Sequence, residues 1–140
     1  MTKAKVIFAD DDKVVRSVVS GLLEQNGYEV LSAGDGEETV RLAKENLPAA
    51  VIMDIKMPNK NGIEACKELK ANSSTKLIPV IMLTGVAGLE EISQALAAGA
   101  VSCLTKPCDT KSLLKTLCNA ITPGKQACWC KPRRESSLRR

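Results

Sequence analysis

The stretch "VIFADDDKVV", residues 6–15, joins an apolar run to three consecutive aspartates and then to apolar residues at helical spacing. The apolar run is typical of a buried strand, and Asp10, Asp11 and Asp12 come directly where it ends. Carboxylates this close repel one another unless a cation or hydrogen-bond donors offset their charges. The stretch therefore suggests two roles for these aspartates: capping a helix and binding a cation.

Strand and helix patterns alternate outward from this stretch until residue 121. The expected strands are residues 5–9, 28–33, 49–53, 77–83 and 101–104, and the expected helices are residues 13–26, 36–47, a segment along 63–69, a segment from 89 to the Gly99 stop, and a segment from about 110 to 121. Unbroken apolar strands separated by helices predict an α/β fold with a five-stranded parallel sheet covered on both faces. Right-handed crossovers restrict this (βα)5 pattern to a doubly wound open sheet, in which ligands bind beyond the carboxyl ends of the strands.

Composition indicates one domain with an aliphatic core. The chain has 140 residues, of which 44% are hydrophobic and only 2% aromatic. No apolar stretch reaches the roughly 20 residues that a membrane span needs, and the N-terminus lacks the apolar segment of a signal peptide. We therefore expect a cytoplasmic protein without a membrane partner.

The basic residues are concentrated at the C-terminal end. Six of the 20 basic residues but only one of the 16 acidic residues follow residue 121, so the net charge of +4 belongs to that end. The remainder has a slight acidic excess, which argues against direct nucleic-acid binding by the folded part. We predict a folded domain over residues 1–121 and a basic, flexible tail or linker over residues 122–140.

Six cysteines raise the question of a structural zinc site. They form no C-x-x-C pair, and the chain has no histidine, so the usual zinc spacing is missing. Cys66 and Cys118 fall on apolar helix faces and are expected to be small core residues. A redox or metal role for Cys128 and Cys130 has no support in the sequence.

Polar residues follow four of the five expected strands. They are the three aspartates at 10–12, Asp54, Thr84 and Lys106. Each alone has an ordinary structural use: an aspartate before a helix is more often a cap, which we favour for Asp12, while a threonine usually belongs to a turn and a lysine usually faces solvent. Because the carboxyl ends of parallel strands share one edge of the sheet, together they predict a single site.

The chemistry of these side chains suits phosphoryl transfer. Asp10, Asp11 and Asp54 would repel one another unless a cation neutralised them, and Mg²⁺ is the hard cation that such oxygen ligands prefer. Lys106 adds a positive charge and Thr84 a hydroxyl donor. Phosphoryl transfer depends mainly on positioning and charge neutralisation, and a carboxylate can act as its nucleophile to form an aspartyl phosphate.

The motifs "ADDD", "MDIKMPNKNG", "PVIMLTG" and "TKP" occur in that order across about residues 4–121. In this order and at these separations the chain resembles the receiver domain of two-component response regulators, and it is similar to the chemotaxis response regulator. The resemblance implies the flavodoxin-like strand order 2-1-3-4-5.

The resemblance also implies a role for each acidic residue. Asp54 matches the phosphoacceptor and a Mg²⁺ ligand, Asp11 the direct acidic ligand of Mg²⁺, and Asp10 its partner, which often acts through water. The backbone carbonyl of Lys56 would supply a further ligand. Asp12 is then left to cap the helix.

On the switch side, Thr84 resembles the hydroxyl residue that bonds the phosphoryl group, and Lys106 the lysine that pairs with it. The peptide bond to Pro107 is often cis in this family. The position three residues before the lysine usually carries an aromatic residue that moves with the hydroxyl residue, but here it is Cys103. We therefore expect output to depend on the loop at Thr84 and the helix over residues 88–98 without aromatic gating.

The implied function is phosphorelay signalling. A partner histidine kinase or phosphotransfer protein would supply the phosphoryl group, and the surface of residues 88–121 would switch toward a downstream output protein or domain. Such a protein is a signalling switch rather than a metabolic enzyme, although it supports its own phosphotransfer and dephosphorylation. A phosphorylation-dependent homodimer is a further arrangement that the sequence leaves open.

Three other readings compete with this one. A haloacid-dehalogenase-type phosphatase would use Asp10 as nucleophile and Asp12 as acid/base, but only Asp109 and Glu135 follow Lys106 as acidic ligands, and Asp54 would have no role. A phosphate-independent interaction module on the same fold would be favoured by the loss of an acidic or lysine position, and none is lost. A flavin or nucleotide binder would need a glycine-rich loop after the first strand, which is missing.

Overall fold

A five-stranded parallel sheet forms the centre of the molecule. The computed structural model describes residues 4–57, 59–85, 89–105 and 110–121. Its elements are β1 (Ala4–Ala9), α1 (Lys13–Gln25), β2 (Tyr28–Ala33), α2 (Gly36–Asn46), β3 (Ala50–Asp54), α3 (Gly62–Ala71), β4 (Val80–Thr84), α4 (Leu89–Ala97), β5 (Ser102–Thr105) and α5 (Thr110–Ile121). The strand order β2-β1-β3-β4-β5 confirms the predicted doubly wound sheet.

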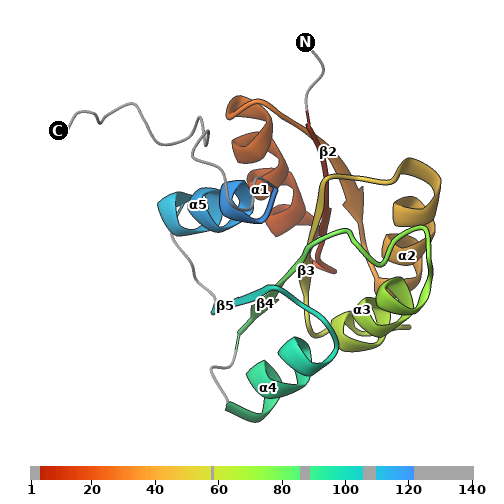
Figure 1. The fold of residues 1–140 in the computed structure, drawn as a ribbon. Coiled ribbons are helices and arrows are strands. Elements are labelled where there is room, and N and C mark those ends of the chain that lie inside the picture. The colour runs from red at the N-terminus through yellow and green to blue at the C-terminus, as the bar shows by residue number, and fades with distance from the viewer. Residues whose placement is uncertain (1–3, 58, 86–88, 106–109, 122–140) are drawn as a thin grey trace, which may run out of the picture.

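Helices cover both faces of the sheet (Figure 1): α1 and α5 lie on one side, and α2, α3 and α4 on the other. Side chains of each strand alternate between these faces, so the sheet contributes to two separate cores. One core joins Phe8 and Ile52 to Leu23 and Leu117, and the other joins Ile7 and its strand neighbours to α2, α3 and α4. Full burial of the central strands explains why they read as unbroken apolar runs.

Helix α1 buries only one of its two apolar stripes. Leu23 is fully buried and Val15 and Val19 pack against the same core, but Val14 and Val18 are 70% and 64% exposed. The helix ends close to the predicted residue: Asn26 is the C-cap, and Gly27 follows it with a φ of 94° that glycine adopts without strain. The exposed valines therefore need another explanation than core packing.

Two apolar segments differ from the sequence prediction. Strand β4 begins at Val80 rather than at residue 77, and Leu77 is 88% exposed. Pro79 precedes the strand and lacks the N–H of a ladder residue, although its carbonyl accepts a hydrogen bond from Val51 N. On α4, Leu96 continues the helical spacing of the apolar residues 89 and 92 in the sequence, but it is 48% exposed because the small side chain of Ala95 faces the core instead.

Cys66 and Cys118 lie in the core, as the sequence predicts. Cys66 is fully buried, its thiol donates to the carbonyl of Ala98 at 3.4 Å, and burial raises the pKa of that thiol. Cys118 is also buried, as expected of a small core residue, and it is disulfide-bonded. Within the described part of the chain, no helix has the length and apolar character required to cross a membrane.

Candidate functional site

The carboxyl ends of three neighbouring strands meet at one edge of the sheet. The parallel register pairs Ala9 of β1 with Met53 of β3, and Met53 with Met82 of β4. The residues that follow along the strands are therefore brought together at this edge: Asp10 after β1, Asp54 at the end of β3 and Thr84 at the end of β4. The order of the strands therefore brings polar side chains from distant parts of the chain to the same edge of the sheet.

Three carboxylates gather there as the sequence predicts. Asp10, Asp11 and Asp54 each offer an oxygen, and these oxygens all lie within 4.8 Å of one another. Asp10 is 1% exposed and Asp54 is 8% exposed, whereas Asp11 faces solvent. Negative charges held so close and so far from water are unfavourable unless positive charge or hydrogen-bond donors surround them.

Part of this charge is met by nearby donors. The backbone N–H of Asp12 donates to Asp10 Oδ1 at 2.9 Å, and that of Lys56 donates to Asp54 Oδ1 at 3.3 Å. Arg16 donates from its guanidinium to the backbone carbonyl of Asp10 at 2.6 Å, which brings a fixed positive charge to the cluster. Sequence reasoning missed Arg16, since a single arginine on the first turns of a helix gives no signal of its target.

The third aspartate of the run serves the helix. The side chain of Asp12 accepts hydrogen bonds from the N–H groups of Val14 at 2.9 Å and Val15 at 3.3 Å, which makes it the N-cap of α1. The predicted division is confirmed in this respect: Asp12 caps the helix, and Asp10 and Asp11 join Asp54. Because Asp12 is engaged in the cap, it is poorly suited to the acid/base role that the phosphatase alternative requires.

The loop between β3 and α3 is packed closely on both sides. At Gly62 an added Cβ would lie 2.5 Å from the carbonyl oxygen of Asp54, so no other residue fits without a shift of the backbone. At Gly36 an added Cβ would lie 2.1 Å from the carbonyl oxygen of Lys60, to which the N–H of Gly36 donates at 2.9 Å. The loop that carries Lys56 is thus held between the acidic cluster and the start of α2.

A side-chain link adds to this anchoring. Asn59, with a left-handed φ of 65°, donates to Asp35 Oδ2 at 2.8 Å, while Asp35 Oδ1 caps α2 by accepting from the N–H of Glu38 at 2.8 Å. These two hydrogen bonds, the one from Glu38 first, lower the pKa of Asp35. The sequence offered no sign of this pairing, which joins residues 24 positions apart.

Thr84 contacts helix α4. Thr84 is 2% exposed, and its hydroxyl donates to Glu91 Oε1 at 3.4 Å. Cys103, at the position where an aromatic residue is expected, is partly buried; burial and, to a smaller extent, the carboxylate of Glu91 raise the pKa of its thiol. Glu91 was not among the predicted site residues, because one glutamate on a solvent-facing helix is ordinary.

A pocket of about 520 Å³ opens beside the acidic cluster. Its lining comes from Asp11, from the β3–α3 loop and α3, and from Glu91 and Gln94 of α4. The predicted residues Lys106 and Pro107 lie outside the described residues.

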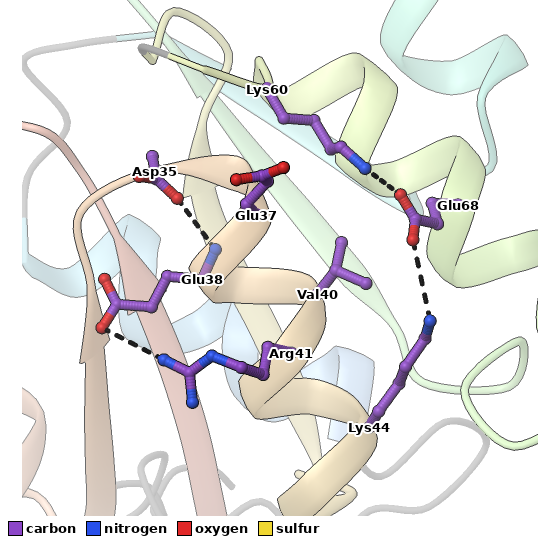
Figure 2. Close-up of a pocket in the computed structure, with 8 residues that line it drawn as sticks. All are labelled: Asp35, Glu37, Glu38, Val40, Arg41, Lys44, Lys60 and Glu68. Carbon is purple, nitrogen blue, oxygen red and sulfur yellow. Dashed lines mark hydrogen bonds and ion pairs between the residues drawn. The ribbon is translucent and has the colours of Figure 1, made fainter.

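A second pocket, of about 640 Å³, lies between α2 and the β3–α3 loop and is drawn in Figure 2. Glu68 of α3 pairs there with Lys60 and, at 3.6 Å, with Lys44 of α2. The lining combines acidic and basic side chains, and its lysines and arginine form ion pairs with Glu68 and Glu38. Exposed ion pairs of this kind add little stability. This pocket therefore joins two helices and lacks the uniform charge of an anion or cation site.

Comparison with known proteins agrees with this geometry. A family model described as the response regulator receiver domain matches residues 6–118. Protein PilH of Pseudomonas aeruginosa is 36% identical over 121 residues, which cover 86% of this chain and 99% of PilH. Several longer transcriptional regulators match at 33–36% identity, and the chain spans only about half of their lengths, from 43% to 57%.

Solved structures share the whole fold. The chemotaxis response regulator CheY4 of Vibrio cholerae has a TM-score of 0.80 at 37% identity, covering 85% of this chain and 99% of CheY4. The receiver domain of sensor histidine kinase PA1611 from P. aeruginosa, with a magnesium ion coordinated in its active site cleft, has a TM-score of 0.80 at 28% identity, covering 86% and 98% of the two chains. The chain therefore belongs to the family of response regulator receiver domains, the signalling switches of two-component systems that accept a phosphoryl group on an aspartate.

Proposed function

We propose that Asp54 is the phosphoacceptor of this receiver domain and that Asp10, Asp11, Asp54 and the backbone carbonyl of Lys56 bind Mg²⁺. The observation that carries the proposal is the meeting of three carboxylates, from β1 and β3, within 4.8 Å at the carboxyl edge of the sheet. Asp54 ends β3 and is held by the register between the ends of β1 and β4.

The residues fit a magnesium ion chemically. Every side-chain donor is a carboxylate oxygen, the ligand that Mg²⁺ prefers, and the exposure of Asp11 leaves room for the waters that Mg²⁺ retains. Two of the three carboxylates are almost fully buried, so their mutual repulsion supports the need for a cation. When bound, Mg²⁺ would supply charge neutralisation for the acidic cluster and for the incoming phosphoryl oxygens.

The protein's own residues would then carry out the transfer. A carboxylate oxygen of Asp54 forms the new P–O bond while the P–N bond to a phosphohistidine of the partner breaks, and the imidazole nitrogen leaves. The hydroxyl of Thr84 and the ammonium of Lys106 would hold the transferred oxygens. Hydrolysis of the aspartyl phosphate by water resets the switch.

A docking face for the phosphodonor lies next to this site. Val14 and Val18 are one helical turn apart on α1, which begins directly after the aspartates, and both are largely exposed. A histidine kinase or phosphotransfer protein that brings its histidine to Asp54 must cover this part of the surface, and exposed apolar side chains are typical of such contacts. We propose the exposed surface of residues 88–121, with Leu96 and Val101, for the output partner.

The experiment is phosphorylation by acetyl phosphate, with intact-mass detection. We expect one phosphoryl adduct that forms with Mg²⁺, disappears with a chelator, and is lost in Asp54→Asn. Asp12→Asn is the matched control, because it removes one neighbouring carboxylate but keeps a residue that can cap α1. An adduct that persists in Asp54→Asn, or that is lost equally in Asp12→Asn, would contradict the assignment.

The limits of the domain are also a proposal. We place the receiver domain at residues 1–121 and a flexible basic tail at 122–140, in a cytoplasmic protein. The tail lies outside the described residues.

A further inference from the structure

Glu91 stands where helix α4 meets the phosphorylation site. It lies on the first turn of α4, is half-buried, and lines the same pocket as Asp11 and Lys56. Its neighbour Glu90 is exposed and does not line that pocket. Only one of these two adjacent acidic residues therefore faces the site.

Strand geometry brings two more side chains to the same place. Side chains alternate along β4, so Thr84 shares a face with Met82, which belongs to the core under α3 and α4. Cys103 of β5 pairs in register with Met82 and packs against that core. Thr84, Cys103 and Glu91 thus meet on the face that α4 covers.

The hydrogen bond between Thr84 and Glu91 is longer than usual. At 3.4 Å it is long for a hydroxyl donor, for which about 2.7–2.8 Å is usual, although its acceptor carries a negative charge. Burial raises the pKa of the Cys103 thiol, and the Glu91 carboxylate raises it further. Glu91 therefore interacts with both Thr84 and Cys103. A cysteine is much smaller than an aromatic residue, and Glu91 reaches Thr84 on the same face of the sheet.

A threonine hydroxyl has one proton to donate. In the free protein that proton is directed to Glu91, whereas a phosphoryl group on Asp54 would offer a second anionic acceptor at the same edge of the sheet. The two acceptors compete for one donor. Formation of one hydrogen bond requires the other to break.

We propose that Glu91 is a positioning residue that holds the Thr84 hydroxyl toward α4 until Asp54 is phosphorylated. This inference rests on the proposed function of Asp54 and Thr84, and it names the regulation of that site. Phosphorylation breaks the Thr84–Glu91 hydrogen bond, which releases the first turn of α4. Glu91 thereby takes over, by a polar contact, the link between the threonine and the output surface that an aromatic residue at position 103 would provide.

The test measures binding of beryllofluoride, a stable mimic of the phosphoryl group, to the full chain with Mg²⁺. Removing the competing acceptor in Glu91→Ala should tighten binding about two- to tenfold, the equivalent of one ordinary hydrogen bond. Glu91→Gln, which keeps an oxygen acceptor but no charge, should give a smaller gain. Glu90→Gln is the matched control for charge on the same helix and should change the affinity little.

Two further measurements separate this role from a general electrostatic effect. In a Thr84→Val background, Glu91→Ala should lose most of its gain, since the donor for which the acceptors compete is gone. In the free protein, the methyl resonance of Thr84 should move in Glu91→Ala toward its position in the beryllofluoride-bound parent.

The inference is overturned if Glu91→Ala binds no tighter than Glu90→Gln, if the gain persists in Thr84→Val, or if the Thr84 resonance stays in place. Failure of the proposed function would look different. In that case the parent itself would bind no beryllofluoride in the presence of Mg²⁺.

Discussion

A side chain cannot be added at residue 62 without moving the backbone at Asp54. A Cβ at Gly62 would lie 2.5 Å from the carbonyl oxygen of Asp54 and 3.0 Å from the Cα of Ile55, and both of these are backbone atoms. The N–H of Gly62 also donates to the carbonyl of Ile55 at 2.8 Å, so the start of α3 is held directly against the end of β3. The absence of a side chain is therefore a requirement of the site.

We predict that Gly62→Ala lowers the free energy of unfolding by about 1–3 kcal/mol, because the backbone around Asp54 must shift to admit the methyl group. Gly21→Ala is the control: a Cβ there meets no atom within 4 Å, so the better helix propensity of alanine should raise the stability by about 0.5–1 kcal/mol. Urea unfolding of both variants would measure this. Similar changes in the two proteins would contradict the account.

The role of a single residue could be predicted where it follows from the position of that residue relative to a strand or helix in the sequence. Asp12 was identified as a cap because it precedes an apolar helical repeat, and Asp54 was singled out because it ends a buried strand. The partners of Arg16 and Glu91 could not be predicted. Their long side chains reach groups fixed by other elements, and the direction of such a side chain depends on tertiary packing.

At the scale of helices and strands, α2 is tied to the β3–α3 loop through one carboxylate. Asp35 caps the helix and accepts from Asn59, and its pKa is lowered by those hydrogen bonds. A group whose pKa is lower in the folded state stabilises the protein above its pKa in the unfolded chain. That stabilisation is lost as the pH falls through the folded value, which places the effect below about pH 4.

We therefore expect the parent to lose more stability between about pH 5 and about pH 3 than Asp35→Asn, in which the ionisable group is absent. Asparagine is a good N-cap, so helix α2 should remain intact. Urea unfolding at the two pH values measures the difference. The control is Glu37→Gln, which changes a side chain on the same turn and keeps the backbone N–H groups of Glu37 and Glu38 that face Asp35. A pH dependence in Asp35→Asn as steep as that of the parent would rule the explanation out.

Element boundaries followed the sequence less closely than element types. The run from residue 77 reads as continuous strand, yet Leu77 is exposed and β4 begins after Pro79. Helix α1 offered two apolar stripes, and local periodicity cannot tell which one the sheet buries. These choices depend on the neighbouring strands and helices, which a local pattern does not contain.

For the whole molecule, the parallel sheet concentrates negative charge at one edge. Asp10 and Asp11 directly follow β1, and Asp54 ends β3. Both strands contribute to both cores, so repulsion among the three carboxylates acts against folding as a whole. A cation that binds the folded site but not the unfolded chain should stabilise the entire domain.

We predict that Mg²⁺ at ten times its dissociation constant raises the free energy of unfolding by about 1.4 kcal/mol. Sodium chloride at equal ionic strength should have a smaller effect, and Asp54→Asn should reduce the response to Mg²⁺. Thermal or urea unfolding with and without Mg²⁺ measures it. Equal stabilisation by the two salts would argue against a specific site.

The overall architecture was the most predictable level. Apolar strands without alternation require a sheet covered on both faces, and the connection rules leave few topologies for five such units. The acidic cluster follows from that topology, since neighbouring parallel strands end at the same edge. The packing of the β3–α3 loop against α2 could not be predicted, because it depends on close backbone contacts that only the assembled molecule reveals.

The close seating of Gly62 also bears on chemical ageing. Asparagine is a thermolabile residue. It deamidates when the following amide nitrogen, here that of Gly62, attacks the side-chain carbonyl. In the folded protein that nitrogen donates to Ile55, and Asn61 Oδ1 accepts from the N–H of Glu64, so both reacting groups are restrained. Isoaspartate at residue 61 would therefore form mainly in molecules that had unfolded, and it would mark them chemically.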